Sequence, residues 1–352
     1  MHLHTNSTPD KITHVSGKEY LFFSGFSYLG LHAHPQYKEA LRNGIDLYGT
    51  VFVSSRIANL RLDLYEELDD TLAEMLRQPA AASFSSGYLA SQAAIQYAAT
   101  KGELCYSPTT HPSLRLGKVI LPNLSWEEWT TQTIEKINAW PDNTFVIVAD
   151  GVNPLTSTIN DFSWLSEINK EVMVVIDDSH GFGVLGTDGG GIIHSLPSHP
   201  PLRYLLSASL AKAFSIQGGV VSGRLEDVIA IKKMPAFTAG TSLMPASAWA
   251  FLQSRTLFRH QRKIMHQRIA EFSTLTAGMA QLHNPSLLPI FVLNAGIEKV
   301  LENKGIIISS FGYPNPDSPP VNRIVITALH QTPQLQTLHL QLQRAFSSKQ
   351  TD

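Results

Sequence analysis

The stretch Ile176-Asp-Asp-Ser-His-Gly-Phe-Gly-Val-Leu-Gly186 follows directly on an apolar, β-branched run at 172–176. Such a run predicts a strand that is buried on both faces of a parallel sheet. Open α/β sheets bind their ligands at the carboxyl ends of the strands, so Asp177 and His180 are candidate site residues. On these residues alone, a strand end with solvated acidic side chains is an equally good interpretation.

Lys212 lies in the stretch Ser207-Ala-Ser-Leu-Ala-Lys-Ala-Phe-Ser-Ile-Gln-Gly-Gly219, among small and apolar residues. Burial disfavours the ammonium form and lowers the pKa of a lysine, and the free amine can form a Schiff base with a carbonyl compound. Most lysines are surface charges, but these surroundings argue against an exposed position. The stretch therefore indicates a reactive lysine.

A third stretch, Phe84-Ser-Ser-Gly-Tyr-Leu-Ala90, is a Ser/Gly turn that leads into an Ala-rich helix reaching about Ala99. The free backbone N–H groups and the dipole at a helix start favour a phosphate group there. An ordinary helix cap explains the same residues, so this pattern alone is a weak indication.

The middle of the chain alternates apolar runs, at 145–149 and 219–222, with helical stretches. This alternation predicts a mostly parallel sheet covered by helices on both faces. Leucines at every fourth position predict an amphipathic helix. They are Leu60, Leu64, Leu68, Leu72 and Leu76.

The two ends of the chain have a mixed pattern. A strand at 19–23 and a helix at 35–46 are expected near the start, and one long helix is expected at 245–283. Strands at 305–309 and 323–327 precede a last helix, for which Thr332 is the expected N-cap. The apolar face of this last helix consists of Leu335, Leu338, Leu342 and Phe346.

These patterns predict an α/β protein with two domains. We expect a large α/β domain at 46–235, and a connecting helix and smaller C-terminal α+β domain at 236–352. The segment 1–45 is expected to pack with the small domain.

The composition excludes several classes of protein. Of the 352 residues, 43% are hydrophobic and 16% charged, which favours a folded chain with a large core. The net charge of −2 and the lack of basic runs argue against a nucleic-acid partner. No apolar run is long enough to span a membrane, and the first residues lack the pattern of a secretory signal. The single cysteine, Cys105, excludes an intramolecular disulfide and a Cys-rich metal site, so we expect a cytoplasmic protein without a metal.

Taken together, the three stretches resemble the α-oxoamine synthase family of pyridoxal-phosphate (PLP) enzymes. The family motif V-D-E-A-H-S-F-G-V-L-G is matched by 176–186, T-L-S-K-A by 209–213, and S-S-G-Y-L-A-N by 85–91. The motifs occur in the family's order over nearly the whole chain. The resemblance implies PLP-dependent transferase fold type I, which is aspartate aminotransferase-like, with a PLP-binding large domain.

The resemblance also implies four catalytic roles. Lys212 would carry PLP and later move protons at the substrate α-carbon, and Asp177 would pair with the pyridine nitrogen, so that the ring accepts electrons. His180 would hydrogen-bond the phenolic oxygen of the ring. His111, in Thr109-Thr-His-Pro-Ser113, matches the histidine of the family's N-H-A-S motif, which stacks on the ring.

Contacts with the cofactor phosphate are implied for Ser86, Gly87, Tyr88 and Ser209. Thr241, in Gly240-Thr-Ser-Leu-Met-Pro245, matches a threonine that reaches the phosphate of the partner subunit. The resemblance therefore implies a homodimer with shared active sites.

The implied reaction is a decarboxylating Claisen-type condensation of a small amino acid, L-alanine or glycine, with an acyl-CoA or acyl-carrier-protein thioester. Arg323 matches the family arginine that binds the amino-acid carboxylate. L-Alanine with a pimeloyl thioester, as in biotin synthesis, is the favoured pair, and glycine with an acetyl donor is the alternative. An aminotransferase of the same fold, or a PLP-binding protein without turnover, are further alternatives.

Two segments depart from the family pattern. The glycine-rich Y-G-x-G-S-G-G-S-R becomes Tyr48-Gly-Thr-Val-Phe-Val-Ser-Ser-Arg56, with bulky Val51, Phe52 and Val53 near the implied acyl-thioester entrance. Pro154 replaces a serine that contacts cofactor or substrate, and its side chain cannot donate a hydrogen bond. These changes leave the acyl donor open.

Overall fold

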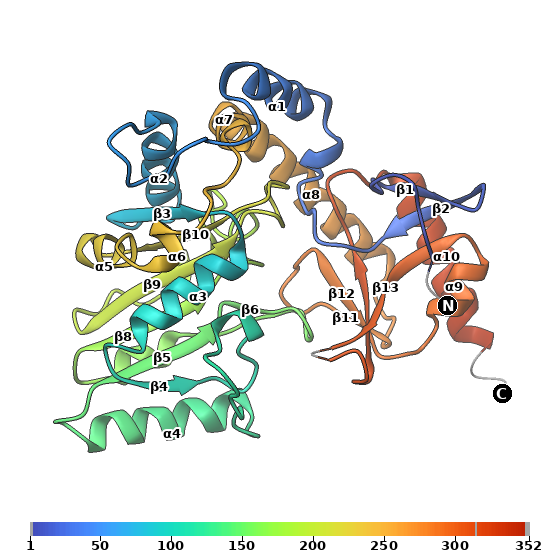
Figure 1. Cartoon of the computed structure of the whole chain (residues 1–352). Helices are drawn as coiled ribbons and strands as arrows, with labels where there is room; N and C mark the ends of the chain where they lie inside the picture. Colours follow the sequence, from blue (N-terminus) through green and yellow to red (C-terminus); the bar gives the residue numbers. More distant parts are fainter. Residues whose placement is uncertain (1–2, 314, 349–352) are drawn as a thin grey trace. The chain divides into compact units, whose positions relative to one another are not determined.

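The computed structural model describes residues 3–313 and 315–348, which form two compact units (Figure 1). The first unit comprises 1–34, 154–158 and 256–352, and the second comprises 35–153 and 159–255. The boundaries of these two units differ from those of the expected domains. The expected domain boundaries therefore stay a prediction.

The second unit is built on a six-stranded sheet with the order β3-β10-β9-β8-β5-β4. Strands β4, β5, β8 and β9 are parallel neighbours, and β10 is antiparallel to both β9 and β3. The strands are β3 (Ala80–Phe84), β4 (Glu103–Tyr106), β5 (Phe145–Asp150), β8 (Val172–Asp177), β9 (Leu202–Ser209) and β10 (Gly219–Gly223). The expected mostly parallel sheet is confirmed, and every residue of β5 and β8 is buried.

The register of the parallel strands aligns their carboxyl ends. Asp150 of β5 is paired with Asp177 of β8, and Asp177 is paired with Ser207 of β9. Three polar residues from three separate chain segments therefore lie side by side at one edge of an apolar sheet.

Helices of this unit surround the sheet in Figure 1, where α3 crosses in front of the strands. They are α1 (Pro35–Tyr48), α2 (Asp63–Met75), α3 (Gly87–Ala98), α4 (Trp126–Ala139), α5 (Leu225–Ile231), α6 (Pro235–Thr238) and α7 (Pro245–Gln253). Helix α3 packs closely because its buried face is made of alanines, which join the core that Val146, Val148 and Val175 form on the sheet.

The expected leucine helix is correct in part. Leu64, Leu68 and Leu72 are buried on α2, but Leu60 lies before the helix and is 72% exposed. The reason is the backbone of Leu62, which is extended (φ −105°, ψ 110°) and lets the helix begin only at Asp63. The spacing of leucines at every fourth position therefore begins before the helix itself does.

The first unit contains a second six-stranded sheet, with the order β1-β2-β13-β14-β12-β11. Its strands are β1 (Ile12–Val15), β2 (Lys18–Phe23), β11 (Leu282–His283), β12 (Ile290–Leu293), β13 (Ile306–Gly312) and β14 (Pro320–Val325). The N-terminal β2 runs parallel to β13. Its helices are α8 (Arg255–Leu275, whose first residue belongs to the second unit), α9 (Glu298–Asn303) and α10 (Thr332–Ser348). A separate two-stranded pair consists of β6 (Val152–Asn153), which belongs to the second unit, and β7 (Thr158–Ile159), whose two residues fall in different units.

Three expectations for this part of the chain are corrected. The long helix at 245–283 is two helices, because Ser254 leaves helical angles (φ −111°, ψ 10°), and its end is replaced by β11. Arg323 lies inside β14 rather than opening a strand. Thr332 is the first residue of α10 rather than its cap, although the predicted apolar face of that helix is buried. Among the described residues, no helix is both long and apolar enough to cross a membrane.

His330 is a buried polar residue that ties the first unit together. Its ring stacks on Phe23 with 4.3 Å between ring centroids, and Nδ1 accepts the N–H of Thr327 at 2.9 Å. Nε2 lies 3.0 Å from the carbonyl oxygen of Phe22, to which it donates in the neutral ring. Burial lowers the pKa of His330 to about 4, since a charged imidazole would lose its hydration.

We predict that His330 makes the stability of the protein depend on pH. The unfolded state gains this proton near pH 6.5 and the folded state only near pH 4, so stability is complete above pH 6.5 and is lost as pH falls between these values. In urea titrations at pH 7, 6 and 5, the advantage of wild type over His330→Gln should shrink by about 1.4 kcal/mol per pH unit inside this window. An advantage that is independent of pH would contradict the prediction.

Candidate active site

Asp177 is held at the end of β8 by two donors. Its Oδ1 accepts the backbone N–H of Ser179 at 2.9 Å, and its Oδ2 accepts the hydroxyl of Ser113 at 3.2 Å. The side chain is buried. A carboxylate fixed in this way can pair with a protonated ring nitrogen without first having to be oriented.

His111 is linked to Asp177 through Ser113. His111 is the N-cap of a short 3₁₀ turn, Pro112–Leu114, and its Nδ1 lies 2.7 Å from Ser113 Oγ. Its backbone N–H donates to Asp150 Oδ1 at 3.2 Å. Burial is the main cause that lowers the pKa of His111, so the neutral ring that stacking on a cofactor requires is favoured.

Two of the three carboxyl groups at this edge favour their neutral form. Burial, followed by the proximity of Asp177, raises the pKa of Asp150 well above its usual range. Burial likewise raises the pKa of Asp178, although Asp178 Oδ2 accepts the N–H of Ile192 at 2.8 Å. The sheet edge is thereby spared three adjacent negative charges.

Lys212 and His180 meet where the chain leaves two neighbouring strands. His180 follows β8 and Lys212 follows β9, and Lys212 Nζ lies 2.8 Å from His180 Nε2. The turns are joined by a further contact, since the N–H of Ser209 donates to Ser179 Oγ at 2.9 Å. The predicted pair is brought together by the parallel register of the strands.

The start of α3 forms a close cradle with the end of β9. Ser86 is the N-cap of α3, and its Oγ accepts the N–H of Leu89 at 3.1 Å. A Cβ on Gly87 would lie 2.6 Å from the Cβ and 2.9 Å from the Oγ of Ser209, so only glycine fits there. The N–H groups of Gly87 and Tyr88 belong to the first turn, which has no carbonyl partners within the helix. This cradle fits a phosphate group.

These groups of the second unit suit PLP. They offer an amine beside an imidazole, a fixed carboxylate, and a helix start packed against Ser209. The residues that would hold the group are Ser86, Gly87, Tyr88, His111, Asp177, His180, Ser209 and Lys212.

Two predicted residues are not among these groups. Thr241 is exposed, in the segment between α6 and α7, and its contact with a partner subunit stays a prediction. Arg323 belongs to the first unit, where its NH1 donates to the carbonyl of Pro154 at 3.4 Å and its guanidinium lies 5.2 Å from the ring centroid of Phe311. Its Nε is buried and has no hydrogen-bond partner among the described residues, and its role in binding a carboxylate stays a prediction.

Sequence reasoning missed the residues that position the site. Ser113 and Ser179 fix Asp177 and the turn after β9, and Asp150 holds the backbone of His111. Ser113 and Ser179 had a signal, because each stands two positions after a predicted site residue, His111 or Asp177, in a motif that was already recognised.

The sheet and the site define the class of a fold type I PLP enzyme. The family of aminotransferases of class I and II matches residues 27–339, and the chain belongs to this family. The predicted fold and the predicted PLP cofactor are confirmed at this level.

Relatives within the family point to a narrower group. The chain is 28% identical over 344 residues to the 8-amino-7-oxononanoate synthase of Stutzerimonas stutzeri, covering 92% of this chain and 87% of the relative. It is 26% identical to the enzyme of the same name from Pseudomonas fluorescens, covering 96% and 91%.

Solved structures share the fold. The serine palmitoyltransferase of S. paucimobilis, solved with PLP and myriocin, has a TM-score of 0.85 at 17% identity and covers all of this chain and 94% of its own. The 8-amino-7-oxononanoate synthase of Francisella tularensis has a TM-score of 0.70 at 23% identity, with coverages of 94% and 99%.

We predict that Lys212 is the covalent anchor of PLP. Borohydride reduction of the PLP-loaded protein should fix the cofactor on the peptide that contains Lys212, because this amine lies beside His180 in the site. Peptide mass mapping measures the label. Lys38→Ala, which removes an exposed lysine of α1, should retain the label, and Lys212→Ala should lose it. Label on another lysine would show that the assignment is wrong.

Proposed function

We propose that the protein is an 8-amino-7-oxononanoate synthase, a PLP-dependent C-acyltransferase that condenses L-alanine with a pimeloyl thioester and releases CO₂. The observation that carries this proposal is the Lys212–His180 pair beside the fixed carboxylate of Asp177. The names of the relatives that match over nearly the whole chain support the choice of substrates.

The residues of the chain account for the chemistry as follows. PLP, when bound, accepts the electrons that a carbanion at the substrate α-carbon would otherwise hold. Lys212 Nζ takes the α-proton of alanine, and His180 orients this amine through its 2.8 Å contact. Arg323 binds the alanine carboxylate. The α-carbon then bonds to the thioester carbonyl and the thiolate leaves. The carboxyl group is lost as CO₂, and Lys212 Nζ returns its proton to the α-carbon.

Glycine with an acetyl donor is the alternative that the bulky segment 51–53 favours. In the second unit, however, Val51 and Val53 are 51% and 93% exposed, and Phe52 packs against Tyr65 with 6.0 Å between ring centroids. Exposure on one protomer does not decide between a long and a short acyl donor, because Val51 and Val53 also belong to the apolar surface proposed to meet a second copy.

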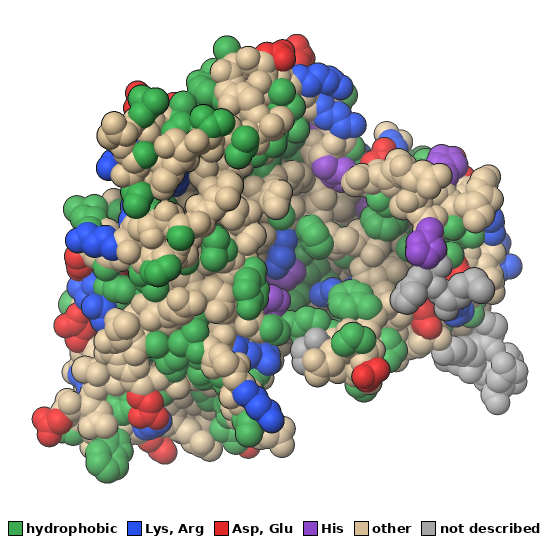
Figure 2. Space-filling view, viewed as in Figure 1, with side chains coloured by type: hydrophobic (Ala, Val, Ile, Leu, Met, Phe, Trp, Pro, Cys, Tyr) green, Lys and Arg blue, Asp and Glu red, His purple; other side chains and the backbone are tan. Residues whose placement is uncertain are grey.

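A homodimer with shared active sites is part of the proposal. Exposed apolar side chains recur along α1 and the segment before α2, where Figure 2 shows hydrophobic atoms on the surface. They are Ile45, Leu47, Val51, Val53, Ile57 and Leu60. Such a surface supports contact with a second copy, and Thr241 would reach the partner's cofactor from the same unit. The cytoplasmic location stays a prediction.

The proposed reaction predicts a defined set of products. Incubated with L-alanine and pimeloyl-CoA, the PLP-loaded protein should form 8-amino-7-oxononanoate, coenzyme A and CO₂, which mass spectrometry detects. Lys212→Ala should reduce this rate by at least about a thousandfold, since the variant lacks the amine to which the proposal assigns the α-proton. A parallel incubation with glycine and acetyl-CoA should give little product.

Other outcomes would contradict the assignment. Product from glycine and acetyl-CoA alone would identify a glycine C-acetyltransferase. Conversion of alanine to pyruvate, with the amino group left on the cofactor, would identify an aminotransferase.

A further inference from the structure

A cavity of about 260 Å³ in the second unit is lined by four cations, one carboxylate, and aliphatic and aromatic side chains. Arg56 and Arg61 come from the segment before α2, and Lys232 and Lys233 follow α5. Glu66 is the one carboxylate in the lining that the described residues contribute. The proposed reaction uses none of these residues.

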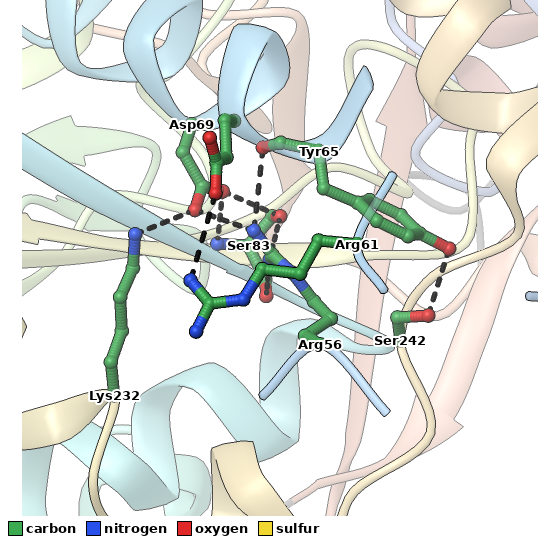
Figure 3. A network of polar contacts seen from close by, with 8 residues as sticks. Arg56, Arg61, Tyr65, Asp69, Ser83, Lys232 and Ser242 are labelled. Atoms are coloured by element: carbon green, nitrogen blue, oxygen red, sulfur yellow. Dashed lines mark hydrogen bonds and ion pairs between the residues drawn. The ribbon is translucent and has the colours of Figure 1, made fainter. Parts of the chain in front are cut away.

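The cations are incompletely neutralised. Asp69, buried on α2, shares its Oδ2 between Arg56 NH2 at 2.9 Å and Lys232 Nζ at 2.8 Å. Its Oδ1 accepts both the N–H and the hydroxyl of Ser83, at 2.8 and 2.7 Å. Figure 3 shows Asp69 between Lys232 and Ser83. Because one buried carboxylate serves two cations, its negative charge cannot balance both.

The other lining charges leave the same surplus. The ion pair between Arg61 and the exposed Glu66 is long, at 4.0 Å, and Lys233 is exposed. The four cations therefore face two carboxylates, Asp69 and Glu66, which is an excess of two positive charges.

Two aromatic rings fix the inner cation. The Arg56 guanidinium lies 4.8 Å from the ring centroid of Tyr65 and 4.9 Å from that of Phe237. The hydroxyl of Tyr65 donates to the carbonyl of Leu243 at 2.7 Å and lies 2.8 Å from Ser242 Oγ. The inner wall is thus held in place, while Arg61 and Lys233 are exposed.

We propose that this cavity binds a compact anion that carries phosphate groups, as a free diphosphate or as the phosphate end of a larger ester. Charge selects the class, because an excess of two positive charges and Arg and Lys donors match phosphate oxygens. Size limits it, because the volume is below the roughly 300–1,000 Å³ of sites that enclose whole drug-sized ligands. The cavity shares no residue with the cradle at Ser86, Gly87 and Ser209.

Calorimetric titration of the PLP-loaded protein with inorganic diphosphate tests this proposal, since the cofactor already occupies the first phosphate site. Lys233→Ala should weaken binding about tenfold, as should Arg61→Ala. Glu66→Gln removes the repelling carboxylate and should tighten binding. Lys38→Ala removes the same charge from α1 and should leave binding unchanged.

A second titration with coenzyme A distinguishes the sources. Competition with diphosphate, and the same sensitivity to Lys233→Ala, would assign the site to the phosphate end of a coenzyme A ester. Binding of diphosphate alone would assign it to a free anion. No diphosphate binding at millimolar concentration, or binding that all four variants leave unchanged, would overturn the proposal.

Discussion

The parallel register of β5, β8 and β9 is the constraint on which the candidate site depends. It sets Asp150 beside Asp177 and Asp177 beside Ser207 at the edge of a buried sheet. Two carboxyl groups in this position would repel each other and lose hydration, so the pKa of Asp150 rises and N–H and O–H donors gather around Asp177. The cost of burying these groups is met by the same contacts that position them.

The rest of the site follows from where the chain leaves these strands. The turns after β8 and β9 bring His180 to Lys212, and the end of β9 meets the start of α3 so closely that residue 87 must be glycine. The sheet therefore brings together a carboxylate, an amine beside an imidazole, and the cradle at the start of α3, all from segments that are distant in sequence. Arg323 belongs to the first unit, where its buried guanidinium Nε has no partner among the described residues.

Much of this arrangement could be predicted from the sequence, for identifiable reasons. Strands buried on both faces read as continuous apolar runs, and the lysine and Asp-x-x-His motifs are local patterns. Ser113 acts on Asp177 across 64 positions, and no local pattern shows such a contact. Periodicity also continues past real helix ends, as at Leu60 and Ser254, because it records apolar spacing and not backbone angles. The cationic cavity was invisible for the same reason, since its residues lie between positions 56 and 237.

The central claim is that this site removes the α-proton of an amino acid at Lys212. The most direct measurement is proton NMR of L-alanine in D₂O with the PLP-loaded protein and no thioester. The account predicts that the α-proton signal disappears while alanine persists, and that Lys212→Ala abolishes this exchange. An α-proton signal that stays constant with the wild-type protein would contradict the account.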